Sequence, residues 1–136
     1  MELIVSNAQG RVPISVLKII GSVDSFTYQE LIERVKELRA EGALYLLLDL
    51  SETVYLSSAG IMALYSITKV MRGEGANEFL DGWSALRQMD RERENGQPTQ
   101  LKLYKPQLRV QNILEMVGFD QFFEIFDDLE SAVKAF

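Results

Sequence analysis

Apolar residues near the N-terminus gather in two runs that are typical of β-strands. Two segments rich in valine and isoleucine, residues 3–5 and 12–20, are separated by residues 6–11. That connection contains the turn formers Asn7 and Gly10, so the pattern predicts an antiparallel hairpin. Pro13 has no N–H to donate, and its strand should therefore lie at a sheet edge or begin near this residue.

A helical repeat replaces the strand pattern after the hairpin. Thr27 and Glu30 have the spacing of a capping box, in which the hydroxyl caps the backbone and the carboxylate reaches back. Gly42 indicates where the helix stops. The apolar positions between these signals recur at helical spacing, with charged residues between them: Leu31, Val35 and Leu38. The pattern predicts an amphipathic helix.

The middle of the chain combines a fully apolar run with a second helical stripe. Residues 44–50 are nearly all apolar, which predicts a central strand covered on both faces. Residues 58–72 predict a helix, with Gly73 as its stop. The stripe of this helix comprises Ile61, Leu64, Ile67, Val70 and Met71.

The C-terminal part repeats the order of strand and helix. Residues 101–104 read as a strand, and Pro106 leads into a helix over residues 107–117 that Gly118 closes. Residues 122–126 predict a last short strand.

Asp127 and Asp128 then begin a final helix, where its dipole favours negative charge. Alternating strands and helices imply parallel crossovers, and the hairpin adds an antiparallel edge. We expect an α/β fold with a mixed sheet of four to five strands and about four helices.

Residues 74–100 do not fit this alternation. They contain few apolar residues, three glycines and a charge-rich stretch, so we interpret them as an insert within a single domain spanning residues 1–136. An apolar helical stripe within the insert is expected to pack on its own domain rather than on a partner. Its members are Phe79, Leu80, Trp83, Leu86 and Met89.

Length and apolar runs limit the class of protein. A chain of 136 residues fits one domain. Its apolar runs are far shorter than the roughly 20 residues needed to span a bilayer. The N-terminus has a carboxylate at Glu2 instead of a basic region followed by an apolar stretch, so no secretory signal is indicated. We therefore expect a cytoplasmic protein without membrane insertion.

Composition removes most catalytic mechanisms. The chain has no cysteine and no histidine, which excludes disulfides, thiolate or imidazole metal ligands and Ser-His-Asp chemistry. No glycine-rich phosphate loop and no supported pair of carboxylates is present. We expect no enzyme, no cofactor and no metal. The formal charge of −6 argues against nucleic acid, so protein partners become the default.

Residues 49–61 read Asp-Leu-Ser-Glu-Thr-Val-Tyr-Leu-Ser-Ser-Ala-Gly-Ile, which resembles the signature of STAS domains. That signature is a buried strand ending in Asp-Leu-Ser, a short link, and Asp-Ser-Ser-Gly-Leu opening a helix. Residues 21–24, Gly-Ser-Val-Asp, resemble the family's Gly-Glu-Leu-Asp, and residues 106–126 resemble its Pro-containing helix and Phe-rich strand. The resemblance covers nearly the whole chain outside the insert and implies a STAS-type mixed sheet.

The resemblance to bacterial anti-sigma factor antagonists implies a signalling role in transcription regulation. In these antagonists, a partner anti-sigma factor that is itself a serine kinase phosphorylates the serine matched by Ser58. The unmodified antagonist binds that partner and so releases a sigma factor. A phosphate at a strand-to-helix junction would face free N–H groups and the positive end of the dipole, leaving the fold intact. The implied docking face includes the helix after Ile61 and the residues Asp24, Ser25, Ser57, Ser58, Ala59, Gly60 and Ile61.

Two departures from the signature keep other interpretations open. Ser57 stands where the family usually has Asp, and Ala59 stands where it usually has the second Ser. Ser57 and Ser58 could act only as helix caps, and Asp24 only as a turn residue. The chain would then be a non-phosphorylated STAS scaffold in a sensory complex or a soluble subunit of a lipid or anion transporter. A ligand sensor with an apolar pocket lined by Phe79 or Trp83 is a third possibility.

Overall fold

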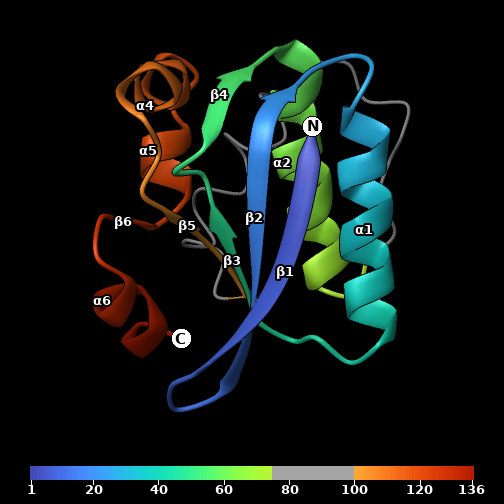
Figure 1. Cartoon of the computed structure of the whole chain (residues 1–136), viewed down its shortest axis with the longest axis vertical. Coiled ribbons are helices and arrows are strands. Elements are labelled where there is room, and N and C mark those ends of the chain that lie inside the picture. Colours follow the sequence, from blue (N-terminus) through green and yellow to red (C-terminus); the bar gives the residue numbers. More distant parts are fainter. Residues whose placement is uncertain (75–99) are drawn as a thin grey trace.

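A computed structural model of the chain describes residues 1–74 and 100–136, in which six strands and five helices form an α/β fold (Figure 1). The predicted insert and its apolar stripe lie almost wholly outside the described residues. The strands are β1 (Glu2–Gln9), β2 (Pro13–Val23), β3 (Leu46–Asp49), β4 (Thr53–Leu56), β5 (Leu101–Tyr104) and β6 (Ile125–Phe126). The helices are α1 (Tyr28–Ala40), α2 (Ser58–Met71), α4 (Leu108–Met116), α5 (Phe119–Phe122) and α6 (Leu129–Lys134).

The strands form one mixed sheet in the order β1-β2-β3-β5-β6, and β4 pairs with the C-terminal part of β2. The hairpin prediction is confirmed, because β1 is antiparallel to β2 while the other pairings are parallel. Both hairpin strands are longer than predicted, which leaves residues 10–12 as the turn. Pro13 is the first residue of β2, a position that does not require it to donate within the strand.

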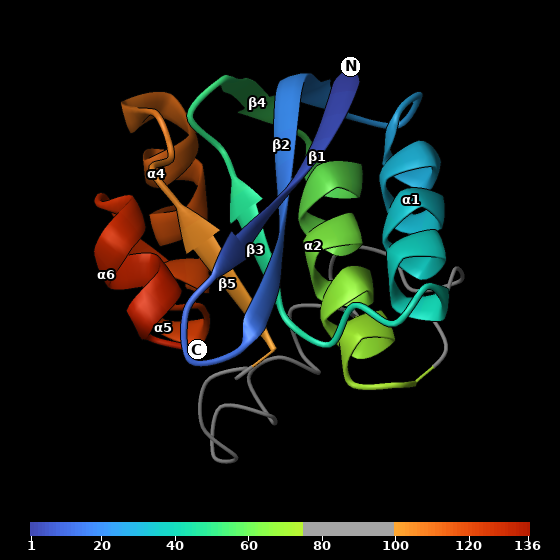
Figure 2. The same cartoon turned by 60° about the horizontal axis from the view of Figure 1, so that its bottom comes forward.

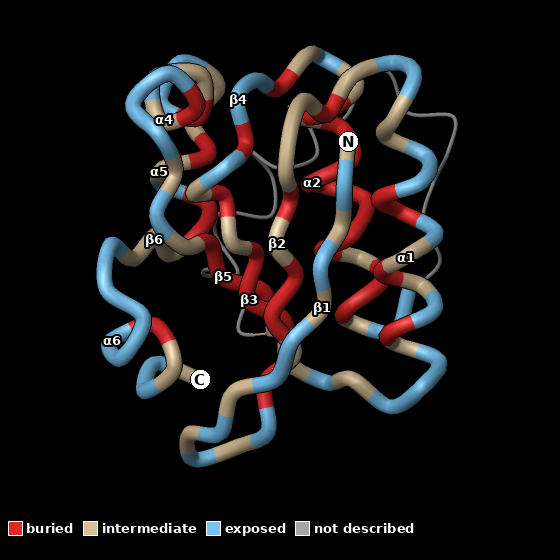
Figure 3. Tube along the Cα trace, in the orientation of Figure 1, coloured by how far each residue is buried: buried red, intermediate tan, exposed pale blue. Residues whose placement is uncertain are grey.

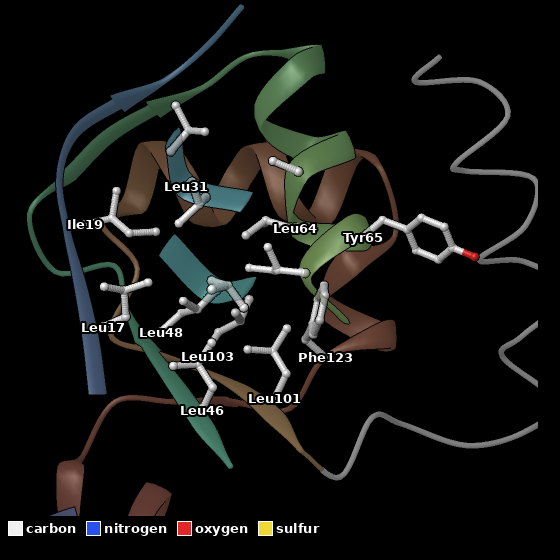
Figure 4. Close-up of a cluster of buried hydrophobic side chains, with 14 of the residues drawn as sticks. Leu17, Ile19, Leu31, Leu46, Leu48, Leu64, Tyr65, Leu101, Leu103 and Phe123 are labelled. Carbon is white, nitrogen blue, oxygen red and sulfur yellow. The ribbon is translucent and has the colours of Figure 1, made fainter. Parts of the chain in front are cut away.

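The larger core lies between one face of the sheet and four helices. Alternate strand residues point to this face, and they meet α1, α2, α4 and α5; α1 and α2 lie side by side (Figure 2). The prediction that residues 44–50 hold a central strand is confirmed, because β3 lies between β2 and β5 and Leu46, Leu47 and Leu48 are buried. Figure 4 shows the centre of this core, formed by Leu17, Ile19, Leu31, Leu46, Leu48, Leu64, Leu101, Leu103 and Phe123.

The opposite face of the sheet carries a smaller core beneath α6. Ala132 of α6 is buried there among strand residues, with Val133 and Phe136 packed against it. Lys102 points to the same face and is buried, but its Nζ contacts Glu124 Oε1 at 2.6 Å and lies 5.3 Å from the centre of the Phe136 ring. The ion pair and the ring compensate the buried ammonium for its lost hydration.

The prediction of a strand over residues 122–126 is wrong for its first half. Phe122 ends the short helix α5, and only Ile125 and Phe126 pair with β5. Phe119, Phe122 and Phe123 are spaced three and four residues apart, so a helical turn brings their rings together, with centroids 4.8–6.3 Å apart. Burial of this ring cluster favours the helical conformation over an extended strand.

Strand β4 was not predicted from the sequence. It pairs with residues 21–23 of β2, beyond the point where β3 stops, and the register shifts between Gly21 and Ser22. Thr53 is buried, and its hydroxyl donates to the Ile19 carbonyl oxygen at 2.8 Å. Gly21 N–H also bonds the Glu52 carbonyl, so both backbone and side chain hold β4 against β2.

Candidate functional site

Two loops meet where the parallel strands β2 and β4 end. Val23 pairs with Leu56 at the last position of both strands, and Ser57 N–H donates to the Val23 carbonyl oxygen at 3.0 Å. The chain leaves β2 towards α1 and leaves β4 directly into α2 at this end (Figure 1). The predicted docking residues 24–25 and 57–61 are therefore brought together, although they are more than thirty residues apart in sequence.

Gly60 allows this close approach. A Cβ atom at Gly60 would lie 2.4 Å from the Val23 carbonyl oxygen, closer than real Cβ atoms come to a backbone oxygen. Only glycine lets the first turn of α2 pack directly on the end of β2. Gly60 is the one buried residue among the predicted site residues, and its role is to set the spacing between the two loops.

Ser57 and Ser58 have different environments. Ser57 is the N-cap of α2, with extended backbone, and its Oγ accepts the Gly60 N–H at 3.3 Å. Ser58 is the first residue of the helix and is exposed, and its hydroxyl makes no hydrogen bond within the described residues. The backbone N–H groups of Ser58 and Ala59 are also without an acceptor there, as expected for the first turn of a helix. The capping role thus belongs to Ser57, and the Ser58 hydroxyl is accessible.

The predicted capping box at Thr27 is wrong. Thr27 precedes α1, but its side chain caps nothing in that helix. Its Oγ1 instead donates to the Ser22 carbonyl oxygen at 2.9 Å and accepts the Asp24 N–H at 3.0 Å. The hydroxyl closes the loop onto the end of β2, so it is not available to the helix.

Asp24 fixes the same loop from within. Its Oδ1 accepts the N–H of Phe26 at 2.9 Å and that of Thr27 at 3.2 Å, which is the pattern of an Asx turn. The Asp24 carbonyl oxygen accepts from Tyr28 N–H at the start of α1. Asp24 is thus a turn residue in this structure, and the exposed Ser25 lies at the tip of the turn that it holds.

Phe26 was overlooked in the sequence. It lies in this loop with 93% of its surface exposed, the largest exposed fraction of any large hydrophobic residue in the described ranges. The sequence contains one sign of this exposed residue, a single aromatic side chain between Ser25 and Thr27 in a loop that is otherwise polar.

Most of the remainder of α2 is buried. Ala59 and Ile61 in its first turn are half-buried, whereas every residue from Met62 to Thr68 is buried, as are Val70 and Met71 (Figure 3). Of the predicted docking residues, Ser25 and Ser58 are exposed, and the docking face itself stays a prediction.

An ion pair fixes the link that leads into β4. Lys18 of β2 bonds the Glu52 carboxylate, and Asp49 Oδ1 accepts the Ser51 N–H at 2.9 Å. The hydrogen bond to Glu52, together with the negative charges of Glu52 and Asp49, raises the pKa of Lys18 above its ordinary value. The ion pair thus joins the link before β4 to the side of β2.

The described residues give no indication of a metal site or a membrane span. Residues 1–74 and 100–136 contain no cluster of three or more carboxylates that could hold a metal ion. Within the same ranges, every helix is too short or too polar to cross a bilayer.

Comparison with protein families identifies the class of this chain. The model of the STAS domain matches residues 5–84, which is more than half of the 136 residues. The chain therefore belongs to the STAS domain family. No curated protein sequence matches it significantly.

Solved structures share the fold at low sequence identity. An anti-sigma factor antagonist from Mycobacterium paratuberculosis is 19% identical, with 98% of this chain and 92% of that one covered and a TM-score of 0.67. The anti-sigma factor antagonist SpoIIAA in its unphosphorylated form is 10% identical, with 96% and 93% covered and a TM-score of 0.57. The phosphorylated form of SpoIIAA, a Bacillus cell fate determinant, is also 10% identical, with 97% and 96% covered and the same TM-score.

Proposed function

We propose that this chain is an anti-sigma factor antagonist that works by partner switching. The unmodified chain binds an anti-sigma factor that is also a serine kinase, and phosphorylation of Ser58 ends that binding. The chain is the substrate of this kinase and not itself an enzyme. One observation supports the proposal above the others: the Ser58 hydroxyl is exposed on a surface formed by two loops of a STAS fold.

The chemistry required at Ser58 is a single phosphoryl transfer. The Ser58 oxygen attacks the γ-phosphorus of ATP, its proton passes to a base of the kinase, and ADP leaves. The added charge of about −1.5 to −2 would lie at the N-terminus of α2, near the unbonded N–H groups of Ser58 and Ala59. Because the helix dipole and these donors favour a negative group, the modification should leave the fold intact and act at the surface.

The proposed partners are proteins of the cytoplasm, and we place the chain there. Its charge of −6 favours a partner with a basic surface, since complementary potentials speed encounter and select against wrong partners. Nucleic acid and lipid play no part in the proposed switch.

The test is phosphorylation of the full chain. The purified protein is incubated with ATP and, in turn, with each anti-sigma-type kinase of the source organism, and its intact mass is measured. A family member that is a known substrate is labelled in parallel. We expect one phosphate on the wild type, none on Ser58→Ala, and one on Ser6→Ala, a matched control because Ser6 is an exposed serine of β1 that pairs with Val16, away from the two loops.

A second candidate follows from the capping role of Ser57. Because Ser57 alone caps α2 and Ala59 has no hydroxyl, the helix start is complete without any modification. If no kinase labels the chain while the control protein is labelled, the switch at Ser58 is refuted. The chain would then be a STAS scaffold of a sensory complex or a soluble subunit of a lipid or anion transporter.

A further inference from the structure

The loop before α1 presents an aromatic ring to solvent from a fixed backbone. We propose that Phe26 is the anchor of the anti-sigma factor interface, inserting its ring into an apolar pocket of the kinase partner. This inference rests on the proposed function and names one residue that contributes strongly to the affinity. Phe26 is 93% exposed, and the next most exposed large hydrophobic residue in the described part is Met116, at 85%.

Hydrogen bonds fix the backbone on both sides of the ring. Asp24 Oδ1 holds the Phe26 N–H at 2.9 Å and the Thr27 N–H at 3.2 Å, while Thr27 Oγ1 is bonded to the Ser22 carbonyl oxygen. These bonds hold the backbone of the loop in a conformation in which the ring is exposed. An anchor held ready in a rigid loop loses little conformational freedom on binding, which increases affinity.

The position of the anchor also explains how phosphorylation could act. The loop that carries Phe26 leaves β2 at Val23, whose carbonyl oxygen bonds Ser57 N–H, and Ser58 follows at once. Phe26 and Ser58 are thus three residues and one residue from the two ends of this hydrogen bond, and a partner docked on this end of the sheet meets both. A phosphate there adds charge and bulk at the edge of an apolar contact, and desolvating that charge opposes binding.

Aromatic residues that fill pockets at the centre of interfaces are the usual hot spots of binding. Phe26 has the attributes of such a residue before the partner arrives: large apolar area, almost complete exposure and a fixed backbone. Truncating the ring should weaken the complex strongly and leave the stability of the isolated fold almost unchanged, because the ring is almost fully exposed.

The experiment measures the affinity of the unphosphorylated full chain for the kinase that labels it, by isothermal titration calorimetry without ATP. Phe26→Ala should weaken binding by about 30-fold or more, the range of hot-spot residues. Met116→Ala is the matched control, since it also truncates an exposed apolar side chain, at the end of α4, and it should change the dissociation constant less than about twofold. Urea unfolding of both variants should match that of the wild type.

The outcomes separate this inference from the proposed function. If the wild type binds and Phe26→Ala binds equally well, the anchor is refuted while the antagonist proposal stands. If the wild type binds no anti-sigma-type kinase, the proposed function fails and the inference fails with it. Sedimentation velocity of the free chain should give the same species for wild type and Phe26→Ala. A wild-type dimer that dissociates in Phe26→Ala would show that the ring serves self-association instead.

Discussion

Replacing Gly60 with alanine tests how the two loops of the site are held together. The added methyl group would lie 2.4 Å from the Val23 carbonyl oxygen and 3.2 Å from the Val23 carbonyl carbon. That oxygen cannot simply move away, because it accepts the Ser57 N–H at the end of β2. Relief of the clash must therefore shift the start of α2 away from the sheet.

The magnitude follows from three opposing effects. Forcing a methyl group into a closely packed position costs about 1–3 kcal/mol. Weakening the hydrogen bond from Ser57 to Val23 costs about 1 kcal/mol more. Alanine in place of glycine in a helix gains up to about 1 kcal/mol, and less in the first turn, where Gly60 lies. We expect Gly60→Ala to lower the free energy of unfolding by about 2 kcal/mol, or the melting temperature by roughly 6–10 °C.

Urea unfolding followed by far-UV circular dichroism measures this change. Ser58→Ala is the matched control two residues earlier, because it alters an exposed side chain, and it should stay within about 0.5 kcal/mol of the wild type. If Gly60→Ala is as stable as the wild type, or more stable, helix propensity outweighs the clash. The close contact between α2 and β2 would then be unnecessary, and the reasoning about the site would be refuted.

Three other substitutions test contacts elsewhere in the fold. Thr53→Val keeps the side-chain volume but removes a hydroxyl that donates at 2.8 Å, so urea unfolding should show a loss of about 1–2 kcal/mol, and an unchanged midpoint would contradict it. Glu124→Gln leaves the buried Lys102 ammonium without its counter-charge and should lower the stability of the fold by about 1–3 kcal/mol. Lys102→Met removes the charge itself and should lower the stability less, and the reverse order of the two variants in thermal unfolding would contradict this. Hydrogen bonds with Ser131 lower the pKa of Asp128, so the stabilising contribution of this carboxylate is complete above its unfolded pKa and is lost as the pH falls through its folded pKa. Asp128→Asn should therefore make the melting temperature depend less on pH between about pH 5 and pH 2. An unchanged pH dependence of the melting temperature would exclude this role.

Local patterns were sufficient to predict most of the fold. The hairpin, the buried run that became β3 and the apolar stripes of α1 and α2 are signals contained within each segment, and the structure confirms them. Strand β4 lacks a periodic signal of this kind, because it is only four residues long and only its end residues, Thr53 and Leu56, are buried. It exists because β2 extends past the end of β3 and offers its edge, which is a property of the assembled sheet.

The candidate site was predicted in part for similar reasons. The STAS signature located residues 57–61, and the structure shows how Gly60 brings them to Asp24; phosphorylation of Ser58 stays a prediction. The capping-box prediction failed because the Thr27 hydroxyl donates to the Ser22 carbonyl oxygen, a contact that residue spacing alone cannot reveal. Phe26 was missed because one aromatic residue in a loop has no periodicity to detect.

Ser57→Asp tests what the carboxylate usual in this family contributes next to Ser58, the serine proposed as the phosphorylation site. As an N-cap, aspartate and serine are about equivalent, and the helix dipole adds at most about 1 kcal/mol in favour of the charge. Because Ser57 already accepts the Gly60 N–H, the position of Ser58 should not change. We therefore expect the rate of phosphorylation at Ser58 to change less than about threefold. Ser57→Ala, which removes the cap, should lower the stability by about 1 kcal/mol. An increase of tenfold or more in Ser57→Asp would show that the carboxylate acts in the transfer itself, and that this chain has exchanged a rapidly phosphorylated serine for a slowly phosphorylated one.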